Sequence, residues 1–283
     1  MLKVFTAFSG YDSQCLALNR LANNHPQLKY ELVGWSEIEK NAIQAHNALF
    51  PQYANRNYGD ISTIDWSIVP DFDLFTYSSP CQDFSNAGRM AGGEEESGTR
   101  SSLLWECRKA ILAKKPKYLV FENVPMLVSK KFLPLFDKWC KELESYGYKN
   151  FYAVLNAKDY GVPQNRNRLF MVSILDKDAR YAFPEKFQLK RRLKDVLEKD
   201  VDTKYYLPEK YLPLLDRLTL DTDETICLNS KVNGKQPSLP DRVYSPNGIS
   251  TAVTTCWHPS IVEPLRIREA TKKGIRKLMK VIV

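Results

Sequence analysis

The stretch Phe72-Asp73-Leu74-Phe75-Thr76-Tyr77-Ser78-Ser79-Pro80-Cys81-Gln82 begins as a run of aromatic and apolar residues and ends on a cysteine. Such a run, bounded by serine and proline, predicts a buried strand of a sheet. The segment that follows has glycines at positions 88, 92, 93 and 98 and is predicted to be a loop. Because open α/β sheets form their active sites at the carboxyl ends of strands, we expect Cys81 to lie at such a site.

On both sides of this stretch, strand and helix patterns alternate up to about residue 175, which predicts an α/β fold with a mostly parallel sheet and helices on both faces. The expected strands are 2–7, 30–36, 57–61, 72–77, 118–121, 148–156 and 168–174, and the expected helices are 11–21, 40–49, 101–114 and 131–145. From residue 178 onward prolines recur and the patterns become short and irregular. We therefore expect a catalytic domain at 1–177 and a smaller irregular region at 178–283.

The composition limits the class of protein. The chain has 283 residues and a net charge of +8, with seven basic residues and one acidic residue within 266–280. A basic protein suggests nucleic acid, whereas a terminal basic run is also typical of a solvated helix face. No apolar run approaches the ~20 residues that span a bilayer, and no signal peptide is recognised. The six cysteines form no Cys-x-x-Cys pair, so we expect reduced thiols in a cytoplasmic protein without a metal site.

Polar residues follow several of the expected strands. Phe8-Ser9-Gly10 forms a turn in which glycine lets the backbone approach a ligand. Glu37, at the end of the second strand, is placed to hold ribose hydroxyls, and Asp60 to accept a hydrogen bond from an adenine amino group. These residues together predict a ligand that contains adenosine. The alternative for each of them is a structural role as a helix cap or turn residue.

Four motifs follow one another along the chain: the Phe-x-Gly turn at 8–10, Pro80-Cys81-Gln82, Glu122-Asn123-Val124 and Gln164-Asn165-Arg166-Asn167-Arg168. In this order they resemble the motifs of C5-cytosine DNA methyltransferases of bacteria and phages. Tyr160-Gly161-Val162-Pro163 and the segment 98–103 also resemble that family. The resemblance covers residues 1 to about 175, and this set of motifs in this order is highly specific. It implies a Rossmann-like fold of S-adenosylmethionine-dependent methyltransferases, followed by a target-recognition region.

The resemblance also implies a mechanism. Carbon 5 of cytosine is a poor nucleophile, and addition of the Cys81 thiolate to carbon 6 turns the ring into an enamine that can attack the methyl group of S-adenosylmethionine. Glu122 would hold or protonate ring nitrogen 3, and Arg166 and Arg168 would orient the base, a phosphate or Glu122. The expected cofactor-binding residues are Phe8, Ser9, Gly10, Glu37, Ile38, Asp60, Ile61, Pro80 and Leu103. The expected DNA-binding residues are Gln82, Ser85, Arg89 and Arg242.

The expected substrate is double-stranded DNA with the target cytosine flipped out, because the reacting carbon is inaccessible in the stack. A cognate restriction endonuclease is a further expected partner, and the chain is expected to be a monomer. A transfer-RNA cytosine methyltransferase of the same fold is the alternative enzyme. The family's C-terminal return segment with its Asn-Ser pair is not recognised after residue 250, so a truncated remnant that only binds DNA or cofactor is the alternative of another class.

Single residues also have structural alternatives. Cys81 could be a buried inert thiol, and Glu122 a helix cap or the partner of a lysine. The two arginines could belong to an ordinary surface strand. The segment 83–100 could be a surface loop that contacts nothing.

Overall fold

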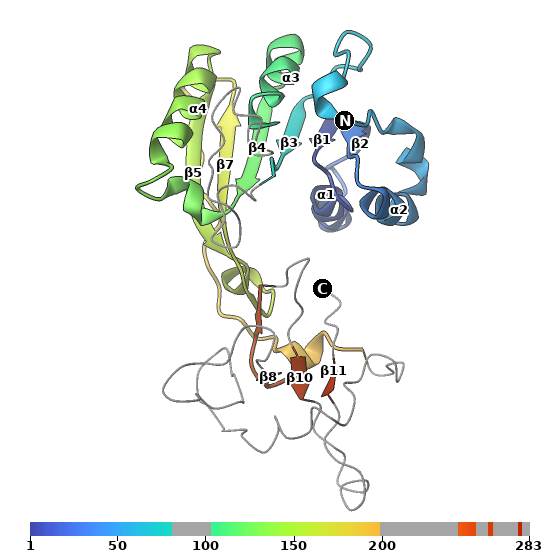
Figure 1. The fold of residues 1–283 in the computed structure, drawn as a ribbon, viewed down its shortest axis with the longest axis vertical. Coiled ribbons are helices and arrows are strands. Elements are labelled where there is room, and N and C mark those ends of the chain that lie inside the picture. Colours follow the sequence, from blue (N-terminus) through green and yellow to red (C-terminus); the bar gives the residue numbers. More distant parts are fainter. Residues whose placement is uncertain (81–102, 199–242, 253–259, 263–276, 279–283) are drawn as a thin grey trace, which may run out of the picture. The chain divides into compact units, whose positions relative to one another are not determined.

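The computed structural model describes residues 1–80, 103–198, 243–252, 260–262 and 277–278. The chain divides into two units: residues 1–155 with 168–183, and residues 156–167 with 184–283. The strands of the first unit's sheet are β1 (Leu2–Ala7), β2 (Tyr30–Ser36), β3 (Leu74–Tyr77), β4 (Tyr118–Asn123), β5 (Lys149–Asn156) and β7 (Asn167–Ile174), and its helices are α1 (Ser13–Asn24), α2 (Lys40–Leu49), α3 (Cys107–Lys114) and α4 (Leu133–Ser145) (Figure 1). The α/β fold class is thereby confirmed.

The six strands of this sheet lie in the order β2-β1-β3-β4-β7-β5. β1 pairs in parallel with β2 and β3, and β3 pairs in parallel with β4. β7 is antiparallel to β4, with Glu122 opposite Phe170 and Asn123 opposite Leu169. The carboxyl ends of β1 to β4 therefore share one edge of the sheet with the amino end of β7.

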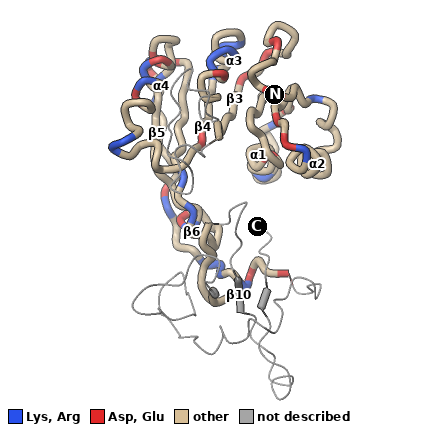
Figure 2. The backbone as a smooth tube through the Cα atoms, in the orientation of Figure 1, with Lys and Arg blue, Asp and Glu red and all other residues tan. Residues whose placement is uncertain are grey.

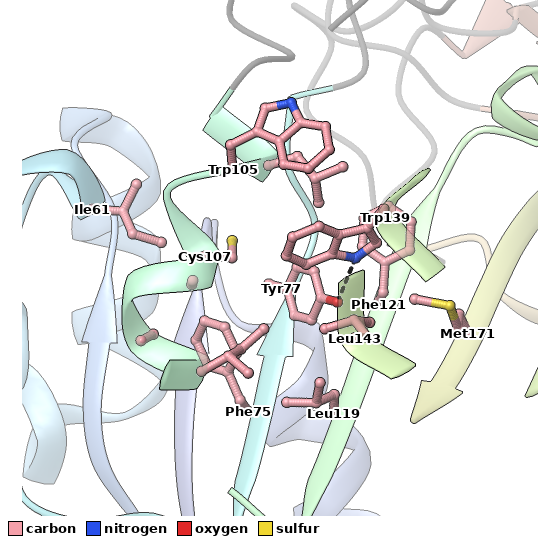
Figure 3. Close-up of a cluster of buried hydrophobic side chains, with 14 of the residues drawn as sticks. Ile61, Phe75, Tyr77, Trp105, Cys107, Leu119, Phe121, Trp139, Leu143 and Met171 are labelled. Atoms are coloured by element: carbon pink, nitrogen blue, oxygen red, sulfur yellow. Dashed lines mark hydrogen bonds between the residues drawn. The ribbon is translucent and has the colours of Figure 1, made fainter. Parts of the chain in front are cut away.

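Alternate side chains of the strands enter two separate cores, because successive side chains of a strand point to opposite faces. Phe5 of β1 packs in a large cluster with residues of α3 and α4, such as Ile111 and Trp139. Val4 packs in a smaller cluster with Cys15 of α1. In the large cluster the indole Nε1 of Trp139 donates to Tyr77 Oη at 3.1 Å (Figure 3). Helices thus cover both faces of the sheet.

The second unit contains short elements. They are η5 (Ala157–Tyr160), β6 (Gln164–Asn165), η6 (Leu193–Asp195), β8 (Val243–Tyr244), β9 (Ser250–Thr251), β10 (Ser260–Val262) and β11 (Lys277–Leu278). β6 pairs in parallel with β9, and β10 pairs with β8 and β11. The predicted functional division at residue 177 stays a prediction.

Two of the predicted elements differ from the structure by more than a shift of a few residues at their ends. The predicted strand at 57–61 is wrong: only Asn57 forms a bridge, to Trp35, between the 3-10 helices η1 (Pro51–Arg56) and η2 (Ile61–Thr63). Gly59 has φ +72, which breaks the extended conformation that a strand needs. The predicted helix at 101–114 begins only at Cys107, where α3 starts.

Charges of both signs are interspersed along α4, whereas the charged residues of α3 are all basic (Figure 2). Of the basic run at 266–280, only Lys277 and Leu278 lie within the described residues. No helix in the described part of the chain is long and apolar enough to cross a membrane.

Candidate active site

The turn between β1 and α1, residues 8–12, lies at the carboxyl edge of the sheet. Its Ser9 N–H donates to Ser36 O at 3.2 Å, and its Gly10 N–H donates to Glu37 Oε2 at 2.9 Å. Phe8, Gly10 and Asp12 all have positive φ, at 54°, 58° and 66°. For a residue other than glycine this conformation costs about 1–2 kcal/mol. No described heavy atom lies within 4 Å of a Cβ built on Gly10, so the backbone there is open to a ligand.

The carboxylate of Glu37 accepts three backbone hydrogen bonds. Oε1 accepts from the N–H groups of Ile38 and Glu39, both at 2.9 Å, and Oε2 accepts from Gly10. A carboxylate has about four lone-pair directions, so one on Oε2 is left for a further donor. This capacity suits a single hydroxyl of a ribose.

The side chain of Asn57 joins the end of β2 to the segment before Asp60. Its Oδ1 accepts from Glu37 N–H at 3.2 Å and from Gly59 N–H at 2.9 Å, and its Nδ2 donates to Glu37 O at 3.1 Å. Ser36 Oγ donates to Gly59 O at 2.7 Å. The segment with Asp60 is therefore fixed beside Glu37.

Asp60 itself is exposed, and its Oδ1 accepts from both Ser62 N–H and Ser62 Oγ. Ile61 is buried, whereas Ile38 is 68% exposed next to Glu37. An exposed isoleucine at this edge offers an apolar surface to a flat ring. The structure thus brings together the predicted residues at the ends of β1 and β2 with those at 60–61.

The ends of β3 and β4 are joined by a buried side chain. Asn123 Nδ2 donates to Ser79 O at 3.2 Å and to Ser79 Oγ at 3.4 Å, and Asn123 Oδ1 accepts from Val124 N–H at 2.8 Å. Both Asn123 and Ser79 are almost fully buried. The backbone two residues before Cys81 is therefore held against the strand that carries Glu122.

Glu122 is paired with Arg168. Arg168 Nε lies 2.9 Å from Glu122 Oε1, and about a quarter of each side chain is exposed. The contact forms because β7 is antiparallel to β4, so that its first residues reach the last residues of β4. The charged guanidinium holds the carboxyl group in place at the sheet edge.

Arg166 lies in the second unit, where Asn156 fixes its backbone. Arg166 N–H donates to Asn156 Oδ1 at 3.1 Å, and Asn156 Nδ2 donates to Asn165 Oδ1 at 2.7 Å. Lys158 N–H donates to the same Asn156 Oδ1 at 3.2 Å. One asparagine thus fixes the segment that carries the Gln-Asn-Arg motif.

Three other thiols are buried, and burial is the main cause that raises their pKa values. The pKa of Cys140 is raised to about 12, and the pKa values of Cys15 and Cys107 are also raised well above the usual value. At neutral pH these thiols are protonated and therefore poor nucleophiles. Each of them packs in a core cluster of the first unit.

Several predicted residues are outside the described part of the chain. They are Cys81, Gln82, Ser85, Arg89 and Arg242. Pro80 and Leu103 are the described residues on either side of the first gap, and both are half-buried.

Sequence reasoning missed two side chains that shape this edge. Asp12 caps α1, with its Oδ1 accepting from Cys15 N–H at 3.0 Å, and Asn57 fixes Glu37. Asp12 could have been found as an acidic residue directly before a helical pattern. Asn57 precedes Tyr58-Gly59, which is a turn signal that we interpreted as part of a strand.

The described residues fit an adenosine ligand. Gly10 leaves space at a ligand-facing turn, Glu37 keeps one acceptor direction, and Ile38 offers apolar surface beside it. Gly10, Glu37 and Ile38 all belong to the first unit, so the adenosine ligand would bind there.

Solved structures with the same architecture are methyltransferases. Dnmt2 of S. pombe matches with a TM-score of 0.64 and 18% identity, over 94% of this chain and 77% of that chain. The methyltransferase EhMeth of Entamoeba histolytica matches with a TM-score of 0.68 and 15% identity, over 99% of this chain and 83% of that chain. At such identities the likeness shows that the chain has the methyltransferase fold.

Sequence comparison gives the family. A family model described as C-5 cytosine-specific DNA methylase matches residues 2–280. Type II methyltransferase M2.ScrFI of Lactococcus lactis subsp. cremoris is 39% identical over 284 residues, which cover 81% of this chain and 76% of the relative. Orphan methyltransferase M.SPRI of Bacillus phage SPR is 31% identical over 288 residues, which cover 90% of this chain and 64% of the relative. The chain belongs to the C-5 cytosine-specific DNA methylase family.

Proposed function

We propose that the chain methylates carbon 5 of a flipped-out cytosine in double-stranded DNA, with S-adenosylmethionine as methyl donor and Cys81 as nucleophile. The observation that carries this proposal is the Glu122–Arg168 pair at the end of β4, next to the asparagine that fixes the approach to Cys81. Family membership supplies the reaction class, and the sequence motifs supply the proposed roles of the site residues.

Binding of the methyl donor would use the first unit. The turn at 8–10 and Ile61 would line the ligand, with Pro80 and Leu103 at the border of the site. The free direction on Glu37 Oε2 would accept a ribose hydroxyl, Asp60 would meet the adenine amino group, and Ile38 would cover the ring. When bound, S-adenosylmethionine supplies an electrophilic methyl group.

The protein's own groups act on the base. The Cys81 thiolate adds to carbon 6, while Glu122 holds or protonates nitrogen 3 and so draws electron density from carbon 6. Arg168 orients Glu122, and Arg166 would contact the base or a neighbouring phosphate. After transfer, water or hydroxide takes the proton from carbon 5, and elimination of the Cys81 sulfur restores the aromatic ring and the free thiol.

Contacts to DNA would come from the segment after Cys81 and from the second unit. Gln82 would contact the DNA, Ser85 and Arg89 would contact its phosphates, and Arg242 would contact DNA from the second unit. We further propose that the protein acts as a monomer in the cytoplasm and belongs to a system with a cognate restriction endonuclease. The names of its relatives include both type II and orphan methyltransferases.

A trapping experiment tests the reaction. DNA with 5-fluorocytosine lacks the carbon 5 proton, so the enzyme should stay covalently attached when S-adenosylmethionine is present. We expect a slow-migrating adduct with the unchanged protein and with Cys140→Ala, and none with Cys81→Ala. An adduct that survives Cys81→Ala would refute the assignment of the nucleophile.

A methyl-incorporation assay that compares DNA with a transfer-RNA transcript distinguishes the substrate. We expect methyl incorporation into DNA of mixed sequence and none into the transcript. Incorporation into the transcript alone would replace the DNA proposal with an RNA one.

A further inference from the structure

A fully buried polar cluster lies behind the β1–α1 turn. Thr6, Asp12 and His46 have no exposed surface. Asp12 Oδ2 accepts from Thr6 Oγ1 at 2.8 Å and lies 3.5 Å from His46 Nε2, and its Oδ1 accepts from Cys15 N–H. A buried carboxylate is costly unless it is paired and hydrogen-bonded, so a cluster of this kind needs a reason.

His46 fixes the cluster to two further elements. It belongs to α2, and its ring stacks on Trp35 of β2 with 3.7 Å between the ring centroids and 19° between the planes. Its Nε2 lies 3.5 Å from Asp12 Oδ2, and neither ring nitrogen has a hydrogen-bond partner among the described residues. The Asp12 side chain therefore connects β1, the turn, and the α2–β2 layer.

Asp12 also closes the turn that carries the predicted cofactor residues. Its N–H donates to Ser9 O at 2.8 Å, and its own φ of 66° is the last of the alternating left-handed residues 8, 10 and 12. Left-handed residues other than glycine persist only where the surroundings hold them. The carboxylate, which accepts hydrogen bonds from Thr6 Oγ1 and Cys15 N–H and packs against His46, provides that hold.

We propose that Asp12 is a positioning residue for cofactor binding, which holds Ser9 and Gly10 in the conformation that meets the ligand, with Thr6 and His46 as its supports. It acts through the turn and does not itself touch the ligand. The inference rests on the proposed function, because the ligand is S-adenosylmethionine. Without the carboxylate the turn gains conformations that must be lost again on binding.

Asp12→Gly tests this inference directly. Glycine adopts the left-handed conformation without strain and is an acceptable N-cap, so this variant removes the carboxylate and leaves the backbone requirement satisfied. We expect the affinity for S-adenosylhomocysteine, measured by calorimetry, to fall by about tenfold or more. The KM for S-adenosylmethionine should rise accordingly, with the KM for DNA unchanged.

A second pair of variants decides the matter if Asp12→Gly does not fold. Thr6→Val keeps the shape and removes the hydroxyl that Asp12 accepts from, and should weaken binding by about fivefold, the equivalent of one hydrogen bond. Thr6→Ser keeps a hydroxyl and should restore the affinity.

Tyr148→Phe is the matched control for stability. It also removes a buried hydrogen bond from the first unit, from Tyr148 Oη to Pro116 O at 2.7 Å, and should lower the melting temperature without changing the affinity. If Thr6→Val and Asp12→Gly lower only the melting temperature, as Tyr148→Phe does, the inference is overturned. If the unchanged protein fails to bind S-adenosylhomocysteine, the proposed function itself fails.

Discussion

Arg168 Nε lies 2.9 Å from Glu122 Oε1, across two strands that run in opposite directions. Arg168→Lys replaces a planar fork with a single ammonium group and should lose the orientation of the carboxyl group. We expect the methyl-transfer rate at saturating substrates to fall by about 10- to 100-fold, which is less than the roughly 10²–10⁴-fold that loss of a general acid or base itself costs, because Glu122 remains. The melting temperature should change little, because partly exposed ion pairs contribute about 0–1 kcal/mol.

Arg56→Lys is the matched control for that change. Arg56 forms a comparable pair with Glu31 in the same unit, at 2.8 Å and about one-third exposed, away from the sheet edge described above. The methyl-transfer rate of Arg56→Lys should equal that of the unchanged protein. A normal rate in Arg168→Lys would contradict a role for this pair in the reaction.

Asn123→Ala should reduce both stability and rate. The substitution leaves the buried Ser79 carbonyl and Val124 N–H without their partner, which costs about 1–3 kcal/mol in the free energy of unfolding. It also releases the backbone next to Cys81. Urea unfolding and single-turnover methylation measure the two effects.

The control for this prediction is Asn150→Ala, which removes a hydrogen bond to Cys140 O from a partly exposed asparagine. The single-turnover methylation rate of Asn150→Ala should equal that of the unchanged protein. Equal rates in the two variants would show that the Asn123 contact matters for folding alone.

Glu37→Gln should weaken cofactor binding. A glutamine has one carbonyl oxygen, so its amide group would face at least one of the three N–H groups that now donate to Glu37. We expect affinity for S-adenosylhomocysteine to drop by about tenfold or more, by calorimetry. Glu39→Gln, which alters only the neighbouring cap of α2, should bind normally; equal losses in both would point to a general effect on α2.

Gly34→Ala should destabilise the first unit. A Cβ at this position would lie 2.7 Å from ring atoms of both Phe5 and Tyr58, which is closer than packed atoms approach. Overpacking of a core by a single methyl group costs about 1–3 kcal/mol, measurable as a lower urea midpoint. The double variant with Phe5→Leu should recover part of the loss, and no recovery would mean that the clash is not the cause.

Cys140 should react with an alkylating agent much more slowly than an exposed cysteine does, and its reactivity should rise only at high pH. Burial raises the pKa of Cys140 to about 12, so the thiolate is favoured only above that pH, and at pH 8 roughly one molecule in ten thousand carries it. Burial also raises the pKa values of Cys15 and Cys107, which should behave likewise. Iodoacetamide at pH 8 followed by peptide mass spectrometry should find these three unmodified in the folded protein and modified in urea.

The predictions from sequence succeeded where local pattern determines structure. The strands at 2–7 and 30–36 and the helix at 40–49 have the predicted bounds, because each is an apolar or periodic run bounded by turn residues. The strand at 57–61 failed because a side chain, Asn57, takes the hydrogen bonds that a strand partner would supply. Local pattern carries no information on such contacts.

The same reasoning explains the residues at the site. Glu37 and Glu122 were found because they end apolar strands, and the structure places each at the sheet edge. The contact between Asp12 and His46 joins α1 to α2 across a whole strand, so only the packed fold reveals it. Asn123 was recognised from the sequence as part of a motif, whereas its hydrogen bond to Ser79 is seen only in the folded structure.

Four of the five tryptophans, Trp35, Trp66, Trp105 and Trp139, are buried in the first unit. Their fluorescence is therefore an intrinsic optical probe of that unit, and a red shift of emission during a melt reports exposure of its core. Because Trp35 stacks on His46, the spectrum also samples the layer behind the β1–α1 turn. Each variant above can thus be followed without an attached dye, in the same cuvette in which ligand is added.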